Sequence, residues 1–565
     1  MINAIKRFGN RLFFNRLPLR AAPSRDVVWT EETLARALNL DLTRGRRAPI
    51  SITRVDVRSS RCSTGSLYIP EMLDGPASEP RAAREAREIQ TAIELGAEAA
   101  VSSLDARSFA PSHRVLRVLN PTAALETLAR AGRERFSGKV VAVTGSVGKT
   151  TTKDIIHHML GHFGSSRATF KNECAVPELY ATIASLPPRV DFATLEMGAF
   201  RPGRMAMRGP IARPDIAVVT NVGLSHLMRF HDPYEILREK VSLFDYLTSE
   251  GTAIVHESIL QVDDARERLI RTKPLSRLVT IGFDKNADVH LVELTSNQAT
   301  LQGVMSVFGA QHRFQLSIPA KHFAENAMFA AATAHVLDLK VADAIAAFAT
   351  FIPSGSRMER WRVQFSTGVI ELIDDSFNAA PKSVLALLDF LLDRETTCRK
   401  VLVLGDMREL GTEEARLHEE LAPEVEQAGI SLLITVGPLA QLVAAKVSAA
   451  IEVRSFDDAV SASEIVPALL QPWDLVAVKA SRAVALEKVV GAITSSGITA
   501  SPSPIGWRIE DELRGVLPRA LFTPSELKTD GGCEGTPLTL SREPLEVLEQ
   551  QRRPWGRAPR KKSHD

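Results

Sequence analysis

Short, uninterrupted apolar runs, each ended by glycine or polar residues, recur through most of the chain. Four lie between residues 140 and 257: VVAVTG, FATLEMGA, IAVVTNVG and GTAIVHE. Four more follow residue 355: VIELIDDS, KVLVLGDM, SLLITVG and DLVAVKAS. Runs that are apolar throughout, without alternation, are typical of strands buried on both faces, and such strands occur in parallel sheets covered by helices. The pattern therefore predicts an α/β protein with two successive doubly wound domains.

The segments outside these two blocks follow other patterns. Residues 50–70 alternate like short strands around a Ser-Thr-Gly turn, and residues 79–98 resemble a charged helix with one apolar side, which indicates a small N-terminal α/β domain. A length of 565 residues fits three or four domains. We therefore expect a basic N-terminal arm over 1–28, an N-terminal domain over 29–137, a central domain over 138–353, a C-terminal domain over 354–500 and an extension over 501–565.

Composition excludes several classes of protein. With 45% hydrophobic and 24% charged residues, the chain is neither disordered nor a membrane protein. Its net charge of +2 gives no reason to expect a nucleic acid partner. Four widely spaced cysteines suit a reducing compartment, so we expect a cytoplasmic protein. The first 25 residues are basic and hold no acid, which argues against a secretory signal; they are either a frayed end or a short segment that contacts an anionic membrane surface.

The first apolar run leads into a glycine turn, GSVGKTTT, at residues 145–152. Backbone N–H groups of such a turn can wrap a phosphate, Lys149 can reach the β and γ oxygens, and Thr150 can ligate magnesium at the start of a helix. The common eight-residue pattern also has glycine at the position of Val143, so this is the shorter variant. The turn predicts a triphosphate site made of Gly145, Ser146, Val147, Gly148, Lys149, Thr150 and Thr151.

Two further polar residues follow apolar runs at the same expected sheet edge. Glu196 ends its run 46 positions after Thr150, and a carboxylate there is the oxygen ligand that Mg²⁺ prefers. A buried glutamate is costly unless it is paired or bound to metal. The next run brings Asn221 and His226 to the edge where ligands of open α/β sheets bind. His226 is either a ligand at this edge or a structural histidine.

In their order along the chain, eight segments resemble motifs of the Mur ligases. VTGSVGKTTTKD resembles the family's ATP loop, NECAVP its Asn-rich turn, LEMGAFRPG its magnesium Glu segment and TNVGLSHL its His segment. HFAENAMFAAA resembles the adenine-side helix, DDSFNAAPKSV the start of the third domain, VLGDMRELG the Gly-Asp-Met-Glu turn and VKASRAVALEKVV the Lys-x-Ser-Arg helix. The resemblance covers roughly residues 50–495 and implies three domains, with a small N-terminal α/β domain, a central P-loop ATPase domain and a C-terminal Rossmann-like domain.

The resemblance implies an ATP-dependent ligase that forms an amide bond through an acyl phosphate, with two Mg²⁺ ions. It is strongest to the family member that adds D-Ala-D-Ala to UDP-MurNAc-tripeptide in peptidoglycan precursor synthesis, so these small molecules are the expected substrates. Lys240 matches the lysine that the family carbamylates. As a carbamate, Lys240 would become an oxygen ligand of the second ion; a solvated helix lysine is the alternative.

The resemblance also assigns the remaining site residues. Catalytic roles fall on Lys149, Lys240, His226 and Arg357, and metal-binding roles on Thr150, Glu196, His226 and Lys240. Asn172, His322, Asn326, Arg357 and Asp375 join the loop residues at the nucleotide, with His322 and Asn326 bracketing the adenine. Substrate contacts fall on Asp56, Arg58, Asn378, Lys479, Ser481 and Arg482. For the last four, a surface or capping role is the alternative.

The sequence departs from the family pattern at several places. Ala320 and Phe323 change the adenine helix, and Ala480 and Lys382 change the expected amine pocket. The N-terminal domain lacks the Lys-Gly and Asp-Gly-His segment of the family, although that domain holds the UDP-sugar carrier. Two alternatives therefore stay open beside a monomeric ligase of this pathway: a paralogue that joins another acid and amine, and a nucleotide-binding regulator without ligase activity.

Overall fold

The structure is a computed structural model, which describes residues 27–40, 49–71, 80–109, 114–223, 227–230, 233–262, 267, 277–296, 300–353, 355–394, 398–503 and 509. These residues form two compact units. The first unit extends to Phe136 and also takes in Tyr180–Arg189, and the second holds Ser137–Leu179 and the chain from Val190 onward. Among the described helices, none combines the length and apolar composition that crossing a membrane requires.

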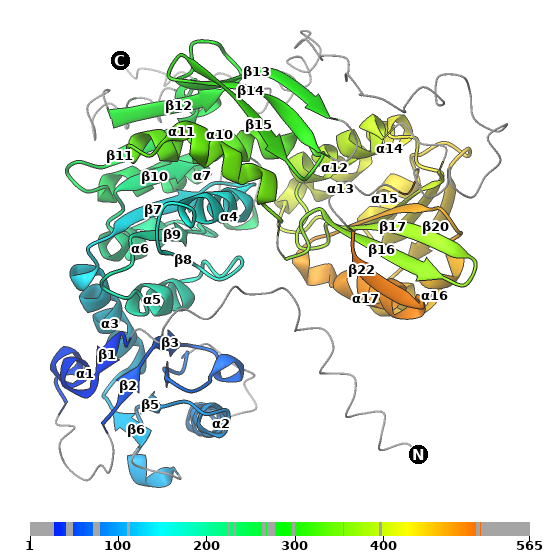
Figure 1. The fold of residues 1–565 in the computed structure, drawn as a ribbon. Coiled ribbons are helices and arrows are strands. Elements are labelled where there is room, and N and C mark those ends of the chain that lie inside the picture. The colour runs from blue at the N-terminus through cyan, green and yellow to red at the C-terminus, as the bar shows by residue number, and fades with distance from the viewer. Residues whose placement is uncertain are drawn as a thin grey trace, which may run out of the picture. The chain divides into compact units, whose positions relative to one another are not determined.

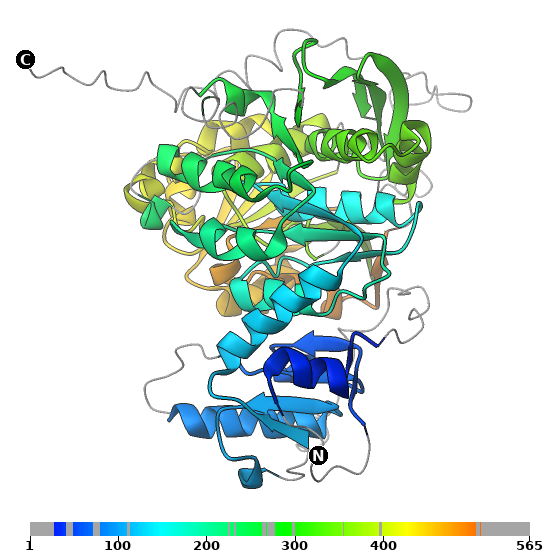
Figure 2. The same cartoon turned by 90° about the vertical axis from the view of Figure 1, so that its left-hand side faces the viewer.

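The first unit is built on a four-stranded parallel sheet in the order β3-β4-β5-β6. Helix α2 packs along this sheet in both views (Figures 1 and 2). The alternating segment 50–70 forms β2, β3 and β4, and the expected charged helix over 79–98 is α2. The elements are β1 (Trp29–Thr30), α1 (Glu31–Leu38), β2 (Ser51–Ile52), β3 (Arg54–Asp56), β4 (Ser66–Tyr68), α2 (Arg81–Glu94), β5 (Ala99–Ser102), β6 (Val115–Arg117) and α3 (Pro121–Arg135).

The second unit contains a nine-stranded sheet in the order β15-β14-β13-β12-β11-β10-β7-β9-β8. The strands from β13 to β8 are parallel, and β14 and β15 are antiparallel. The four apolar runs before residue 257 are the neighbouring strands β11, β10, β7 and β9. The strands are β7 (Lys139–Thr144), β8 (Ser166–Ala168), β9 (Phe192–Glu196), β10 (Ile216–Val219), β11 (Thr252–His256), β12 (Leu278–Gly282), β13 (Val289–Ser296), β14 (Leu301–Val307) and β15 (Ala310–Leu316).

Helices cover this sheet, which explains why its central strands are apolar throughout. Helix α4 follows β7 directly and packs against α10, as Figure 1 shows. Both helices pack into the apolar core of the sheet, where Ile155 and Met328 are fully buried. The helices are α4 (Lys149–Leu160), α5 (Val176–Ala184), α6 (Arg204–Ala212), α7 (Pro233–Val241), α8 (Glu257–Leu260), α10 (His322–Val336) and α11 (Val341–Ala346).

A hairpin that the apolar runs did not predict joins β14 to β15. Val307 pairs with Ala310, so Phe308 and Gly309 form a two-residue turn. Both turn residues have positive φ, 48° and 84°, as this kind of tight hairpin turn requires. The Phe308 ring stacks on His335 of α10 with centroids 3.9 Å apart. This contact holds a bulky residue in a backbone conformation that usually favours glycine.

A seven-stranded sheet in the order β20-β19-β18-β21-β17-β16-β22 follows in the second unit. The strands from β20 to β17 are parallel, which confirms the α/β class with parallel sheets. Its strands are β16 (Glu359–Phe365), β17 (Gly368–Asp374), β18 (Lys400–Gly405), β19 (Leu432–Val436), β20 (Glu452–Phe456), β21 (Leu475–Lys479) and β22 (Thr499–Pro502). Its helices are α12 (Pro381–Asp393), α13 (Glu414–Glu419), α14 (Ala422–Gln427), α15 (Ala440–Ala444), α16 (Ala459–Leu469) and α17 (Glu487–Ser496).

The last strand extends beyond the expected end of the C-terminal domain at residue 500. β22 pairs antiparallel with β16, and this pairing includes Ser501 and Pro502, which we had placed in the extension. Ile509 is fully buried against Val369 and Cys398. The chain therefore remains part of the third-domain fold for at least these residues. Most of the basic arm and the rest of the extension lie outside the described residues.

Candidate functional site

The glycine turn between β7 and α4 has the geometry of a phosphate-binding loop. Gly145 and Gly148 have φ of 151° and 81°, and a side chain at either would collide with Thr220 or Asn326. Helix α4 begins at Lys149, so its first backbone N–H groups have no acceptor within the helix and can face an anion. The Lys149 ammonium donates to the Ser146 carbonyl at 3.0 Å. This bond folds the lysine back over the turn.

Residues at the end of β10 hold the loop in this shape. Asn221 accepts hydrogen bonds from the Ser146 and Val147 N–H groups, both at 2.9 Å, and donates to the Val147 carbonyl. The Thr220 hydroxyl donates to the same carbonyl at 2.7 Å. Ser146 and Val147 were expected at the phosphate. In the structure their backbone groups also form hydrogen bonds with the residues that follow β10. Thr151 is buried in the first turn of α4.

Thr150, Glu196 and Arg357 meet next to the loop. The Thr150 hydroxyl donates to the Glu196 carboxylate at 2.7 Å and accepts a hydrogen bond from Arg357 at 3.1 Å. Thr150 and Glu196 are both buried, and β7 and β9, the strands that carry the loop and Glu196, are adjacent. A hydroxyl and a carboxylate at this spacing form the kind of oxygen pair that Mg²⁺ takes from a protein. The structure thus brings together two of the expected metal ligands and the expected arginine.

Lys240, near the end of α7, is buried and lies within electrostatic reach of Lys149. Glu239 accepts hydrogen bonds from the Gly203 and Met205 N–H groups at the start of α6, which fixes the end of α7 that carries Lys240. Burial, reinforced by the charge of Lys149, lowers the pKa of Lys240 to about 7. Among the described residues, the Lys240 ammonium has no hydrogen-bond or ion-pair partner. His226, the other expected ligand of the second ion, lies outside the described residues.

The start of α10 carries the residues expected at the adenine. Burial lowers the pKa of His322 to about 4, so its ring is neutral at physiological pH. Asn326 accepts a hydrogen bond from the Thr152 hydroxyl at 2.9 Å and donates to the His322 carbonyl at 3.1 Å. In this arrangement Asn326 supports the phosphate loop, which is a role that the sequence did not suggest. Asn172 lies in the turn after β8.

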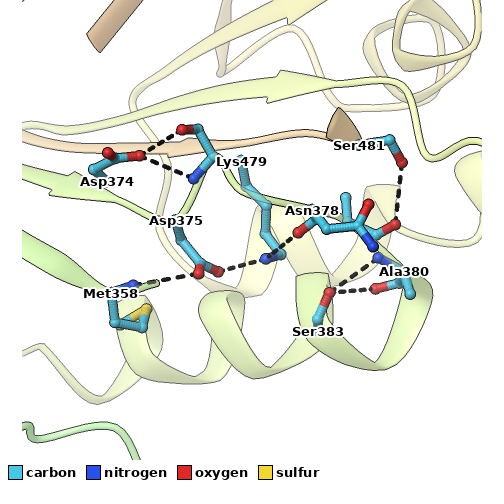
Figure 3. A network of polar contacts seen from close by, with 10 residues as sticks. Met358, Asp374, Asp375, Asn378, Ala380, Ser383, Lys479 and Ser481 are labelled. Atoms are coloured by element: carbon cyan, nitrogen blue, oxygen red, sulfur yellow. Dashed lines mark hydrogen bonds and ion pairs between the residues drawn. The ribbon is translucent and has the colours of Figure 1, made fainter. Parts of the chain in front are cut away.

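The third-domain residues form one polar network at the carboxyl ends of β17 and β21 (Figure 3). Lys479 pairs with the Asp375 carboxylate and donates to the Asn378 carbonyl at 3.0 Å. Ser481 donates to the Ala379 carbonyl at 3.2 Å. Burial raises the pKa of Asp375, and the charge of Lys479 opposes that rise. The Lys479 ammonium and the Ser481 hydroxyl therefore hold the 375–379 segment, while the Asn378 side chain is exposed.

Arg482, Asp56 and Arg58 make other contacts. Arg482 is largely exposed and pairs with Glu487 at 3.2 Å. In the first unit, Asp56 at the end of β3 is buried and pairs with Arg54, and Arg58 is exposed before the short helical turn Ser59–Arg61. Asp56 leaves one carboxylate oxygen buried without a hydrogen bond. Within the described residues, no group of three or more His, Cys, Asp or Glu side chains is arranged to hold a metal.

The sequence placed Asn221 at this sheet edge, but it did not indicate the contacts of Asn221 and Thr220 with the loop, or the role of Phe377. Thr220 and Asn221 shape the loop, and their signal was their position directly after a strand. Phe377 stacks on Arg357, with the guanidinium carbon 3.9 Å from the ring centroid. No pattern along the chain signals this contact, because it joins a linker residue to a residue after β17.

Comparison of the chain with known proteins identifies its family. The family model for the Mur ligase middle domain matches residues 143–334, and the one for the Mur ligase glutamate ligase domain matches residues 356–482. A relative from Synechocystis is 30% identical over 422 residues, which cover 74% of this chain and 87% of the relative. The chain belongs to the Mur ligase family, whose members are ATP-dependent ligases that form amide bonds and use Mg²⁺.

Two relatives from different bacteria carry the same name. The Synechocystis protein is UDP-N-acetylmuramoyl-tripeptide–D-alanyl-D-alanine ligase, and the Bacillus subtilis protein of that name is 27% identical over 417 residues, 73% of this chain and 88% of the relative. The MurF structure from Acinetobacter baumannii shares the fold with a TM-score of 0.68 at 22% identity, covering 83% of this chain and 99% of its own. MurF from Thermotoga maritima, in complex with ADP, gives 0.62 at 24% identity, with 78% and 97% covered.

Proposed function

We propose that this protein joins D-Ala-D-Ala to UDP-MurNAc-tripeptide at the expense of ATP. The observation that carries the chemistry is the meeting of Lys149, Arg357 and the Thr150–Glu196 pair at one loop. The names of the relatives, which this chain matches over most of their length, support the choice of substrates. Neither argument depends on the other.

In the first half-reaction, a carboxylate oxygen of the acid attacks the γ-phosphorus of ATP. The bond from this phosphorus to the β–γ bridging oxygen breaks, ADP leaves, and an acyl phosphate remains. Two anions must approach each other, so cations at the γ-phosphate are needed. Lys149 supplies one at the loop, and Arg357 supplies a second from the segment that precedes β16. The Arg357 guanidinium contacts Thr150 at the start of α4, and its fork can pair with phosphate oxygens.

In the second half-reaction, the amine nitrogen of the dipeptide attacks the acyl carbon, phosphate leaves with its electron pair, and the nitrogen loses a proton. The third-domain network in Figure 3 supports the proposed amine subsite. Lys479 and Ser481 fix the 375–379 segment, and Asn378 presents its amide to solvent beside them. Arg482 offers an exposed guanidinium to a dipeptide carboxylate, whose two oxygens match its fork.

The residues at the loop fit Mg²⁺, which would supply positive charge to the phosphate oxygens when bound. Thr150 and Glu196 would hold the first ion. For a second ion we propose Lys240 as a carbamate, together with His226. Three features support the carbamate. Lys240 is buried, its pKa is lowered by that burial and by the charge of Lys149, and its ammonium has no hydrogen-bond or ion-pair partner among the described residues. A carbamate would convert this cation into an oxygen ligand.

The experiment that tests the function measures phosphate release by the full-length protein with ATP, Mg²⁺ and bicarbonate. Release that requires both UDP-MurNAc-tripeptide and D-Ala-D-Ala, with the joined product seen by mass spectrometry, is the expected result. Release with another acid and amine instead would identify a paralogue. Nucleotide binding without turnover for any pair would identify a regulator.

Two finer expectations belong with this proposal. ATP consumption favours a cytoplasmic location, where this cofactor is available, and fractionation of cells would check it. We also expect a monomer, and light scattering coupled to gel filtration would detect any other state. The proposed weak contact of the basic N-terminus with an anionic membrane surface is tested by vesicle sedimentation with and without residues 1–25.

A further inference from the structure

Phe377 occupies a place between two arginines of the proposed site. Its ring lies 3.9 Å from the guanidinium carbon of Arg357 and 6.0 Å from that of Arg482. A cation over an aromatic face at the shorter distance is attracted to the ring, and the longer distance is at the limit of this interaction. The ring therefore acts mainly on Arg357, the residue that also contacts Thr150 of the phosphate loop.

The backbone that carries Arg357 is held in an unusual conformation. Its neighbours Ser356 and Met358 both have positive φ, 57° and 53°, although neither is glycine. Such a residue is strained, and it persists where surrounding contacts fix it. Here the Phe377 N–H donates to the Ser356 carbonyl at 3.2 Å, and the Met358 N–H donates to Asp375 at 3.3 Å.

These contacts come from one segment, residues 375–377, directly after β17. The Phe377 N–H and the Asp375 carboxylate fix the turn on the two sides of Arg357, and the Phe377 ring supports the guanidinium itself. The residues that follow β17 therefore set the direction of the Arg357 side chain toward the loop. The strained backbone around Arg357 depends on these contacts. Removing the ring would leave the backbone bonds in place and free only the guanidinium.

We propose that Phe377 is a positioning residue, whose ring holds the Arg357 guanidinium in line with the phosphate loop so that it meets the γ-phosphate of ATP without reordering. This inference rests on the proposed nucleotide site and extends it to a residue that does not touch the phosphates. Phe377 acts through Arg357, so its effect should vanish when Arg357 is absent. It should also depend on the aromatic face and be insensitive to a hydroxyl added at the ring edge.

The test is a calorimetric titration of the full-length protein with Mg²⁺ and a non-hydrolysable ATP analogue. Phe377→Ala and Phe377→Leu should each weaken binding about fivefold, the size of one partly buried cation–π contact. Phe377→Tyr should bind within about twofold of the parent, since it keeps the π face. In an Arg357→Ala background, Phe377→Ala should cause no further loss.

Three outcomes would overturn the proposal: unchanged binding in Phe377→Ala, equal loss in Phe377→Tyr, or the same additional loss in the Arg357→Ala background. The matched control is Phe456→Ala in β20, which removes a partly buried ring from the same domain and should leave binding unchanged. Thermal unfolding of each variant separates lost folding from lost positioning, and Phe377→Leu serves where Phe377→Ala is unstable. Titration needs no acceptor substrate, so absent turnover would refute the proposed function and still leave this result readable.

Discussion

The two large sheets of the second unit both bury charged side chains, but they balance these charges differently. In the third-domain sheet, the buried Glu371 lies between Arg360 and Arg394, at 2.6 and 2.9 Å. Lys479 likewise pairs with Asp375. These charges are balanced by partners within the fold, as buried charges ordinarily must be.

Around the phosphate loop of the nine-stranded sheet, three cations make contacts of a different kind. Lys149 donates to a backbone carbonyl, and Arg357 donates to the Thr150 hydroxyl and is influenced by nearby carboxylates. Lys240 has no hydrogen-bond or ion-pair partner among the described residues. Glu196 is the carboxylate at their centre, and it already accepts a hydrogen bond from Thr150. Lys240 is fully buried, whereas Lys149 and Arg357 are half-buried. A buried cation without a partner is costly until an anion arrives. The difference between the two sheets supports the proposal that the anionic substrate binds at the phosphate loop.

Removing one of the cations at the phosphate loop should have the largest effect on activity. Lys149→Ala should lower ATP-dependent phosphate release at least about 1000-fold, because the γ-phosphate loses its nearest fixed charge. Lys139→Ala, at an exposed lysine ahead of the same loop, is the control and should keep full activity. Comparable activity in both variants would contradict the assignment of the loop.

Breaking the buried ion-pair triad of Glu371, Arg360 and Arg394 should lower the stability of the fold and not the rate of catalysis. Glu371→Gln leaves Arg360 and Arg394 without their carboxylate and should lower the free energy of unfolding by about 3 kcal/mol, measured with urea. Burial tends to raise the pKa of Glu371, but the two arginines lower it overall. The carboxylate therefore stabilises the fold above its ordinary pKa, and this contribution is lost as pH falls through the lowered value.

The matched control for the triad is Glu452→Gln, which removes an exposed ion pair with Arg454 in the same domain. It should change the free energy of unfolding by less than about 1 kcal/mol. Equal effects of the two variants would show that the buried triad stabilises the fold no more than an exposed ion pair does.

A variant of Lys240 tests the role of the buried cation near the phosphate loop. Lys240→Ala should lose about 100-fold in turnover, and acetate should restore part of it by supplying the missing oxygen ligand. Because the amine is the form that reacts with CO₂, activation of the parent protein by bicarbonate should rise with pH through about 7, the pKa of Lys240. Full activity of Lys240→Ala without any additive would rule out a carbamate.

The smallest effect is expected where the two parts of the unit meet at the surface. Lys382 of α12 lies 3.7 Å from Glu325 of α10, and the lysine is partly exposed. Lys382→Ala should therefore change the free energy of unfolding by less than about 1 kcal/mol and the KM for ATP less than about threefold. A larger rise in KM would mean that this pair contributes to the nucleotide site and not only to the surface.

Much of the scaffold could be predicted because its signals are local. Eight apolar runs became eight parallel strands, and the turn after β7 contained the glycines that its backbone angles require. The β14–β15 hairpin escaped prediction because its turn places Phe308 at positive φ, a conformation that residue type does not suggest and that stacking on His335 stabilises.

The supporting contacts of the site could not be predicted in the same way. Arg357 meets Thr150 across 207 positions, and Asn326 meets Thr152 across 174, so no spacing along the chain encodes either contact. Resemblance supplied the residues but not their partners: Asn326 was expected at the adenine and is engaged with α4. Lys479 was expected to contact substrate, and its ammonium is already paired with Asp375.

The antiparallel strand β22 has one further consequence. By pairing with β16 it occupies a row of backbone groups that would otherwise lie open at the rim of the sheet. Its own outer rim ends in Pro502, which has no N–H to offer to another molecule. A protein shortened at the end of α17 would expose β16 as a template for strands of neighbouring chains, so these four residues protect the protein against self-association.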